Sequence, residues 1–239
     1  MVNLPNTRTV CPQIELIELV VNPAAGTDNA PLEITRAQLT SLVIPALHAQ
    51  GLDVIVRESG EPALEQFPPS VRLPLTWAGE TEDADLDQIL ALCQDWPGLQ
   101  GILKQAGFLT GPGDHWLPVA STEKGLLYGE LIGQGQDGHY FQPIHVPDKI
   151  RQPLYYLTQY LLRELNVPFR GCCLVQVGWI EGELCFDRLW PFPIQPALAS
   201  LGVQSPDLFY VHYLCCQGLP LKDLRIQGQA PYGELADLS

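Results

Sequence analysis

The sequence predicts an α/β or α+β fold in which mixed β-sheets are flanked by helices, arranged as two lobes or one elongated domain. Strand-like and helical patterns alternate between residues 14 and 56, and a long amphipathic pattern occupies residues 148–165. Two pairs of apolar segments, at 125–146 and 172–190, are joined by glycine-containing turns, which is typical of hairpins. With 46% hydrophobic and 17% charged residues, the 239-residue chain has the composition of a globular protein.

The first elements predict a strand, a helix and a second strand. The apolar run 14–21 predicts the first strand, and Thr35 is a candidate N-cap for a helix that reaches about Gln50 and is kinked by Pro45. Residues 52–56 predict the next strand. A parallel pair with a right-handed crossover is the simplest outcome.

Further elements lead to a candidate domain boundary. Residues 71–77 predict a strand. The acidic run 80–87 precedes an apolar helical pattern, and the positive end of the helix dipole stabilises carboxylates at that position. After a helix at 98–106, the glycines and proline of 111–113 mark a boundary. We therefore expect an acidic α/β lobe at 1–112 and an α+β lobe with two hairpins and helices at 113–239, unless the chain is one continuous domain.

The second half contains the strongest patterns. Residues 148–165 carry leucines and isoleucine at helical spacing, which predicts a helix that packs on a sheet. The segment 172–180 is apolar on both of its faces, which is typical of a strand inside a sheet. Helices at 196–201 and 206–216 follow.

Charge and cysteine content narrow the class of protein. Thirteen basic against 27 acidic residues leave a net charge of −14, which argues against binding nucleic acid through its phosphates. No apolar run has the length of a membrane span or a signal peptide. Seven cysteines, including the pairs Cys172–Cys173 and Cys215–Cys216, favour reduced thiols. We expect an acidic, cytoplasmic protein.

Metal binding is a weak alternative in the cysteine-rich segment. Zinc sites usually take ligands in closely spaced pairs, and the sequence has no Cys-x-x-Cys motif. Cys185, His212 and Cys215 are the nearest candidates for a shared site. Because adjacent cysteines point in different directions, buried thiols are the favoured interpretation, and we predict no metal and no cofactor.

Arg188 is the first candidate for ligand binding, since it lies in an otherwise apolar strand. A partly buried arginine needs a carboxylate partner, or it can bind a ligand carboxylate or phosphate through its bidentate fork. Alternation along the strand places Asp187 on the opposite face, so Glu130 is one of the predicted partners. Together with His145, these residues define a candidate ligand site of Glu130, His145 and Arg188.

A second set of residues predicts a protein interface. Tyr155, Tyr156 and Tyr160 lie beside the apolar stripe of the 148–165 helix, and Trp190 and Phe192 stand at a proline-rich corner. Large aromatic side chains are frequent in protein interfaces.

Several segments of the second half resemble an uncharacterised family of conserved cyanobacterial proteins. They are GLLYGE at 125–130, RQPLY at 151–155, FDRLWPFP at 186–193 and SLGVQ at 200–204. The resemblance covers roughly residues 115–225. It implies a bacterial cytoplasmic setting and brings no activity or catalytic residue.

The sequence predicts a non-catalytic accessory or assembly factor that acts by protein–protein binding. The predicted aromatic edge and acidic first lobe favour a protein partner, with homo-oligomerisation left open. The alternative is an enzyme or small-ligand-binding protein with a site between the 125–146 and 172–190 hairpins, so the sequence leaves enzymatic activity undecided.

Overall fold

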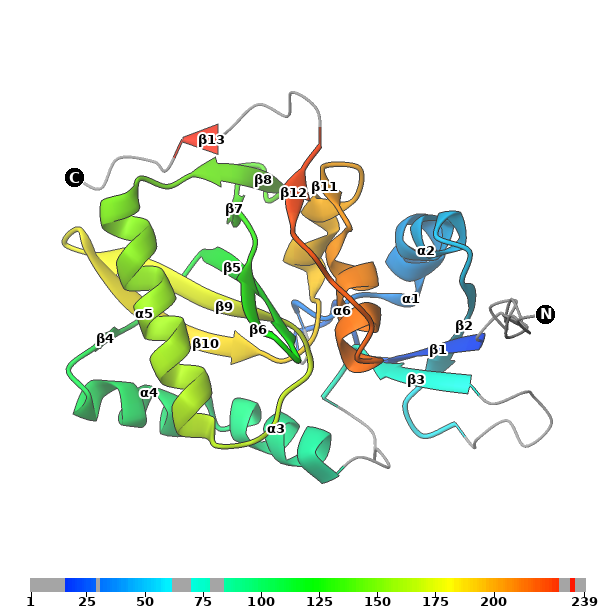
Figure 1. The fold of residues 1–239 in the computed structure, drawn as a ribbon, viewed down its shortest axis with the longest axis horizontal. Coiled ribbons are helices and arrows are strands. Elements are labelled where there is room, and N and C mark those ends of the chain that lie inside the picture. The colour runs from blue at the N-terminus through cyan, green and yellow to red at the C-terminus, as the bar shows by residue number, and fades with distance from the viewer. Residues whose placement is uncertain (1–15, 29–30, 62–69, 78–83, 228–232, 235–239) are drawn as a thin grey trace, which may run out of the picture.

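The computed structural model describes residues 16–28, 31–61, 70–77, 84–227 and 233–234. Within these residues the strands form sheets of three, eight and two members. The three-stranded sheet with its helices and the eight-stranded sheet with its helices give the molecule two lobes (Figure 1). The predicted mixed α/β architecture is confirmed.

The smaller sheet has the order β2-β1-β3 and is parallel throughout. Its strands are β1 (Leu16–Val21), β2 (Asp53–Glu58) and β3 (Ser70–Pro74). The connection from β1 to β2 runs through α1 (Arg36–Gln38), a π-helical segment (Leu39–Val43) and α2 (Ile44–Ala49). The predicted parallel pair with a helical crossover is therefore present.

Local sequence explains the start and the irregularity of this crossover. The Thr35 hydroxyl accepts a hydrogen bond from the Gln38 amide at 3.2 Å, and the Gln38 side chain accepts one from the Thr35 amide at 3.0 Å, which completes a capping box. Pro45 has no amide hydrogen for the carbonyl four residues earlier, and the helix is π-helical just before it.

The larger sheet has the order β13-β8-β7-β5-β9-β10-β4, with β6 paired to β5. Its strands are β4 (Leu109–Thr110), β5 (His115–Thr122), β6 (Gly125–Tyr128), β7 (Leu131–Gln134), β8 (Tyr140–His145), β9 (Gly171–Ile180), β10 (Glu183–Trp190) and β13 (Gly233–Glu234). The remaining small sheet pairs β11 (Gln204–Ser205) with β12 (Arg225–Ile226). The boundary predicted at residues 112–113 therefore falls within one sheet, between β4 and β5.

Helices cover both faces of the larger sheet. The helices α3 (Ala84–Gln94), α4 (Trp96–Gln105) and α5 (Asp148–Leu165) share a core with one face (Figure 1). The other face packs against a 3₁₀ segment (Gln195–Ser200) and α6 (Leu208–Cys216). The bounds of α5 are those that the sequence predicts.

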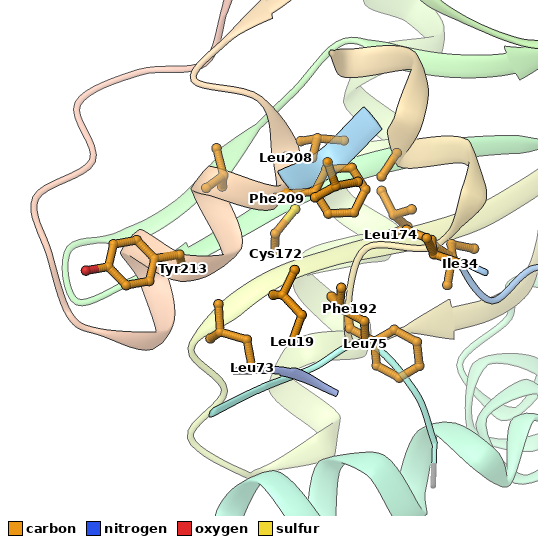
Figure 2. Packing of buried hydrophobic residues seen from close by; sticks show 14 of the residues in the cluster. Leu19, Ile34, Leu73, Leu75, Cys172, Leu174, Phe192, Leu208, Phe209 and Tyr213 are labelled. Atoms are coloured by element: carbon orange, nitrogen blue, oxygen red, sulfur yellow. The ribbon is translucent and has the colours of Figure 1, made fainter. Parts of the chain in front are cut away.

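Strand β9 belongs to two cores at once. Cys173 and Val175 face the α5 side, whereas Cys172 and Leu174 face α6. Figure 2 shows residues of the smaller sheet next to residues of β9 and α6, including Leu19 beside Cys172. One hydrophobic core therefore joins the two lobes.

Among the described residues, no helix has the length and apolar character needed to cross a membrane.

Candidate functional site

Strand β10 departs from regular pairing at Asp187. Phe186 lies opposite Val177 and Arg188 lies opposite Gln176, so Asp187 is an extra residue that forms a β-bulge. A bulge breaks the alternation of side chains between the two faces of a strand. Asp187 and Arg188 consequently reach each other, with Arg188 Nε 3.2 Å from Asp187 Oδ1. The prediction that Asp187 points away from Arg188 is therefore wrong.

The Asp187 carboxylate is held in place from its other side. Its second oxygen accepts a hydrogen bond from the Gly113 amide at 2.9 Å, and its backbone carbonyl accepts one from the Gln100 side chain at 3.0 Å. Asp187 is only 6% exposed. A fixed carboxylate of this kind orients the guanidinium that binds it.

Gly113 lies unusually close to β9. A Cβ at this position would stand 2.4 Å from the Val177 carbonyl oxygen, so only glycine fits. The Gly113 carbonyl accepts a hydrogen bond from Gln176 Nε2 at 2.6 Å, and Gln176 Oε1 accepts one from Trp190 Nε1 at 2.8 Å. This network fixes the indole of Trp190.

The guanidinium of Arg188 lies over two indole rings. Its central carbon is 5.1 Å from the ring centroid of Trp96, at the start of α4, and 5.6 Å from that of Trp190. Such cation–π contacts hold the group without using its hydrogen-bond donors. The Arg188 side chain is 33% exposed.

The terminal nitrogens of Arg188 are its available donors. Among the described residues, the acceptor for the Arg188 guanidinium is Asp187, and the bond is made by Nε. The two terminal nitrogens have no acceptor within that part of the chain. A guanidinium fixed through Nε and clamped by aromatic rings presents its remaining N–H groups in one plane. That geometry suits bidentate binding of a carboxylate or phosphate. We call Arg188, Asp187, Gln176, Trp96 and Trp190 the Arg188 site.

The structure separates the other predicted ligand residues from Arg188. Three steps of strand pairing lead from β10 through β9 and β5 to β7, by way of Arg188, Gln176, Trp116 and Ile132. At the usual strand spacing, β7 therefore lies about 14 Å from β10. Glu130, just before β7, instead forms an ion pair with Arg151 at 3.4 Å. His145 ends β8, one strand farther away. Glu130 is thus not the partner of Arg188.

Two residues of the predicted interface are buried. Trp190 is 5% exposed and Phe192 is 1% exposed. Both rings pack against Trp77, at centroid distances of 5.6 and 5.0 Å. The predicted aromatic corner is therefore part of the core that joins the lobes.

The three tyrosines of α5 differ from one another. Tyr155 stacks on Tyr128 with ring centroids 3.9 Å apart, and Tyr160 packs beside Phe108 at 5.3 Å. Tyr156 is 64% exposed. All three rings thus contact another ring of the chain, since Tyr156 lies 5.7 Å from Phe108, but Tyr156 remains mostly exposed.

The structure also separates the weak metal candidates. His212 and Cys215 lie on α6, whereas Cys185 lies on β10 with its sulfur 3.7 Å from the Pro112 carbonyl. Burial lowers the pKa of His212 to about 4 and raises the pKa of Cys215 to about 11. Among the described residues, no group of three His, Cys, Asp or Glu side chains is placed to hold a metal ion.

The sequence marks Arg188 as a candidate but gives little indication of its surroundings. Trp96 and Gly113 are far from Arg188 in sequence, and the sequence pattern of 111–113 is that of a boundary. The sequence does contain a signal for the position of Trp96, because Asp95-Trp96-Pro97 is typical of a helix start. Asp95 caps α4 by accepting a hydrogen bond from the Gly98 amide at 3.1 Å, which places Trp96 in the first turn.

Comparisons with known proteins give no sequence match and a clear structural one. No family model matches the chain, and no curated protein matches it in sequence. Among solved structures, N5-carboxyaminoimidazole synthetase from Staphylococcus aureus is similar with a TM-score of 0.64 and 13% identity, covering 89% of this chain and 80% of that one. Glycinamide-RNase-transformylase T from Mycobacterium tuberculosis is similar with a TM-score of 0.61 and 14% identity, covering 88% and 81%. Carboxyaminoimidazole ribonucleotide synthase from Aspergillus clavatus, complexed with ATP, has a TM-score of 0.59 and 9% identity, covering 87% and 78%.

These similarities establish a fold shared with enzymes. They overturn the prediction of a non-catalytic assembly factor that acts by protein binding. The burial of Trp190 and Phe192 also removes one of the surfaces on which that prediction rested. The alternative prediction, an enzyme or small-ligand-binding protein, is favoured instead.

Proposed function

We propose that this protein binds a small ligand through a phosphate or carboxylate group, which the guanidinium of Arg188 holds. The observation that carries the proposal is the arrangement of that guanidinium. It is oriented by Asp187, clamped between Trp96 and Trp190, and has its terminal donors available. Charge-assisted hydrogen bonds contribute about 1.5–3 kcal/mol each, so a preorganised fork is a strong anion-binding element.

The flanking indoles support the same function. Their rings replace part of the water around the guanidinium, which strengthens its interaction with an anion. Trp96 is 40% exposed, which leaves part of its ring accessible to a ligand. The aromatic surface suits a ligand that combines an anionic group with a planar one.

Nucleoside phosphates are the first ligands to test. The Aspergillus clavatus synthase was solved with ATP, and another neighbour, with a TM-score of 0.58 and 11% identity, is described as an ADP complex of an N5-carboxyaminoimidazole ribonucleotide synthetase. The planar fork of an arginine matches the geometry of a phosphate bidentately. An enzyme that acts on the bound ligand is the second candidate function, favoured by the synthetases among these neighbours.

The experiment is calorimetric titration of the full chain with ADP, inorganic phosphate and succinate. Arg188→Gln should weaken binding of the best ligand by about 10- to 100-fold, because it removes the charge and part of the fork. Arg188→Lys should recover only part of the affinity, since lysine keeps the charge and loses the planar geometry.

Arg72→Gln is the matched control. The Arg72 side chain is 36% exposed, close to the 33% of Arg188, and it also neighbours a carboxylate, with Nε 3.5 Å from Glu18. This variant should bind the ligand as the parent does. The proposal would be contradicted if Arg188→Gln and the parent bound the best ligand with equal affinity, or if the parent bound none of the three ligands.

A further inference from the structure

A cavity lies on the face of the larger sheet opposite the Arg188 site. It has a volume of about 300 Å³ and lies between the C-terminal half of α5 and the β5–β6 hairpin. Ser121 on β5 lines it. Trp116, five residues earlier on the same strand, lies opposite Gln176, which in turn lies opposite Arg188, so these three face the same side of the sheet. Residues an odd number of positions apart on a strand point to opposite faces, so this cavity is separate from the Arg188 site.

The lining of the cavity is mainly apolar. Five of its eight residues are hydrophobic: Leu126, Leu162, Leu165, Val167 and Phe169. The other three are Ser121, Gln159 and Arg163. An apolar cavity with a few polar groups is typical of small-ligand sites, and an engineered cavity of about half this volume is enough to bind benzene.

The core closes the inner end of the cavity. Leu162, Leu165 and Phe169 also line a tightly packed region beside Cys173 and Leu189 of the sheet, which has no room for a water molecule. Close packing of this kind is usual in protein interiors. Cys173 is fully buried and burial raises its thiol pKa, so it contributes an apolar surface at this end.

The polar groups lie toward solvent. Arg163 and Gln159 are exposed residues of α5, whereas Leu165 and Val167 are buried. Arg163 is the charged residue among the eight that line the cavity. Its guanidinium lies over the Tyr160 ring, with the central carbon 5.1 Å from the ring centroid. It also forms a 3.4 Å ion pair with Glu164 between exposed side chains, which a ligand can replace at little cost. The Ser121 hydroxyl donates to the Phe169 carbonyl at 2.7 Å, so its proton is already used within the protein.

We propose that this cavity binds a small amphiphile with an apolar body and an anionic head, such as a medium-chain carboxylate. The apolar body lies against Leu126, Leu162 and Phe169. The carboxylate lies at the mouth, where the Arg163 guanidinium and the Gln159 amide donate to it. Charge complementarity selects this ligand over a neutral one of the same size.

The experiment is calorimetric titration with sodium octanoate and with 1-octanol. The parent protein should bind octanoate at least tenfold more tightly than octanol. Arg163→Gln should remove that difference, because it removes the charge at the mouth and leaves the apolar walls unchanged. Leu126→Trp should weaken both ligands, because the larger ring fills the cavity from β6.

A control variant locates the binding. Arg151→Gln changes an arginine of the same helix that pairs with Glu130 outside the cavity, so it should bind octanoate as the parent does. Absence of octanoate binding, or equal octanoate affinity of Arg163→Gln and the parent, would overturn the proposal.

Discussion

His212 should make the stability of this protein depend on pH. The imidazole lies on α6 and is 2% exposed. Its Nδ1 accepts a hydrogen bond from the Cys172 amide at 3.0 Å, so the neutral ring carries its proton on Nε2, which faces the Pro74 carbonyl. The ring thereby connects α6 to β9 in one lobe and to β3 in the other. A protonated ring could not accept the bond from Cys172.

Burial sets the direction and size of the effect. It lowers the pKa of His212 from its ordinary 6.5 to about 4. As pH falls below 6.5, the unfolded chain takes up a proton that the folded protein does not accept until about pH 4. Stability should therefore fall across this range, by about 3 kcal/mol in total. Burial raises the carboxyl pKa of Glu33 and Asp207, which favours the folded state at low pH and opposes this trend.

The assay compares urea unfolding of the parent and His212→Gln at several pH values between 4 and 7. Glutamine does not titrate and keeps an acceptor for the Cys172 amide. Between pH 7 and 4 the parent should lose about 3 kcal/mol more unfolding free energy than the variant, because the contributions of Glu33 and Asp207 are common to both. His139→Gln, which removes an exposed histidine, should follow the parent. Parallel pH curves for the parent and His212→Gln would refute the reasoning.

Three further predictions concern stability and thiol chemistry. Gly113→Ala should lower the free energy of unfolding, measured with urea, by about 1–3 kcal/mol, because its Cβ would overlap the β9 backbone. Gly101→Ala, which has open space around its Cβ in α4, should be neutral or raise that free energy by up to about 1 kcal/mol. Equal effects of the two variants would contradict the close approach of Gly113 to β9. Arg57→Met should lower the free energy of unfolding by about 2–3 kcal/mol, because it removes the 3.0 Å partner of the buried Glu18 and leaves the more exposed Arg72 at 3.5 Å. Adding Glu18→Gln should restore part of the loss. Burial raises the pKa of Cys93 to about 12, so its thiol should react with a maleimide only after denaturant is added, and rapid labelling of Cys93 in the native protein would disprove the burial.

Local patterns predicted the elements of this fold well. The apolar stripe of α5 and the Asn166-Val167-Pro168 stop define a helix whose observed bounds are those predicted. The Glu181-Gly182 turn has positive φ at both residues, as a tight hairpin requires, and it joins β9 to β10 where expected. These features depend on neighbours in sequence, which a single chain reveals.

Non-local contacts were the source of the errors. Period-two alternation placed Asp187 on the wrong side of β10 because nothing in the sequence marks the bulge. The candidate trio failed because two strands, β5 and β9, lie between β7 and β10, and strand order depends on long-range pairing. Trp190 and Phe192 were expected at the surface because their burial depends on Trp77, more than a hundred residues away.

The hydrophobic core that joins the two lobes has a consequence for cooperativity. Leu19 and Leu73 of the smaller sheet share this core with Leu174 and Phe209 of the larger lobe. The smaller sheet cannot unfold without exposing apolar surface of β9 and α6 to water. We therefore expect the two sheets to unfold together, so that amides of β1 and β9 exchange with solvent through the same global opening.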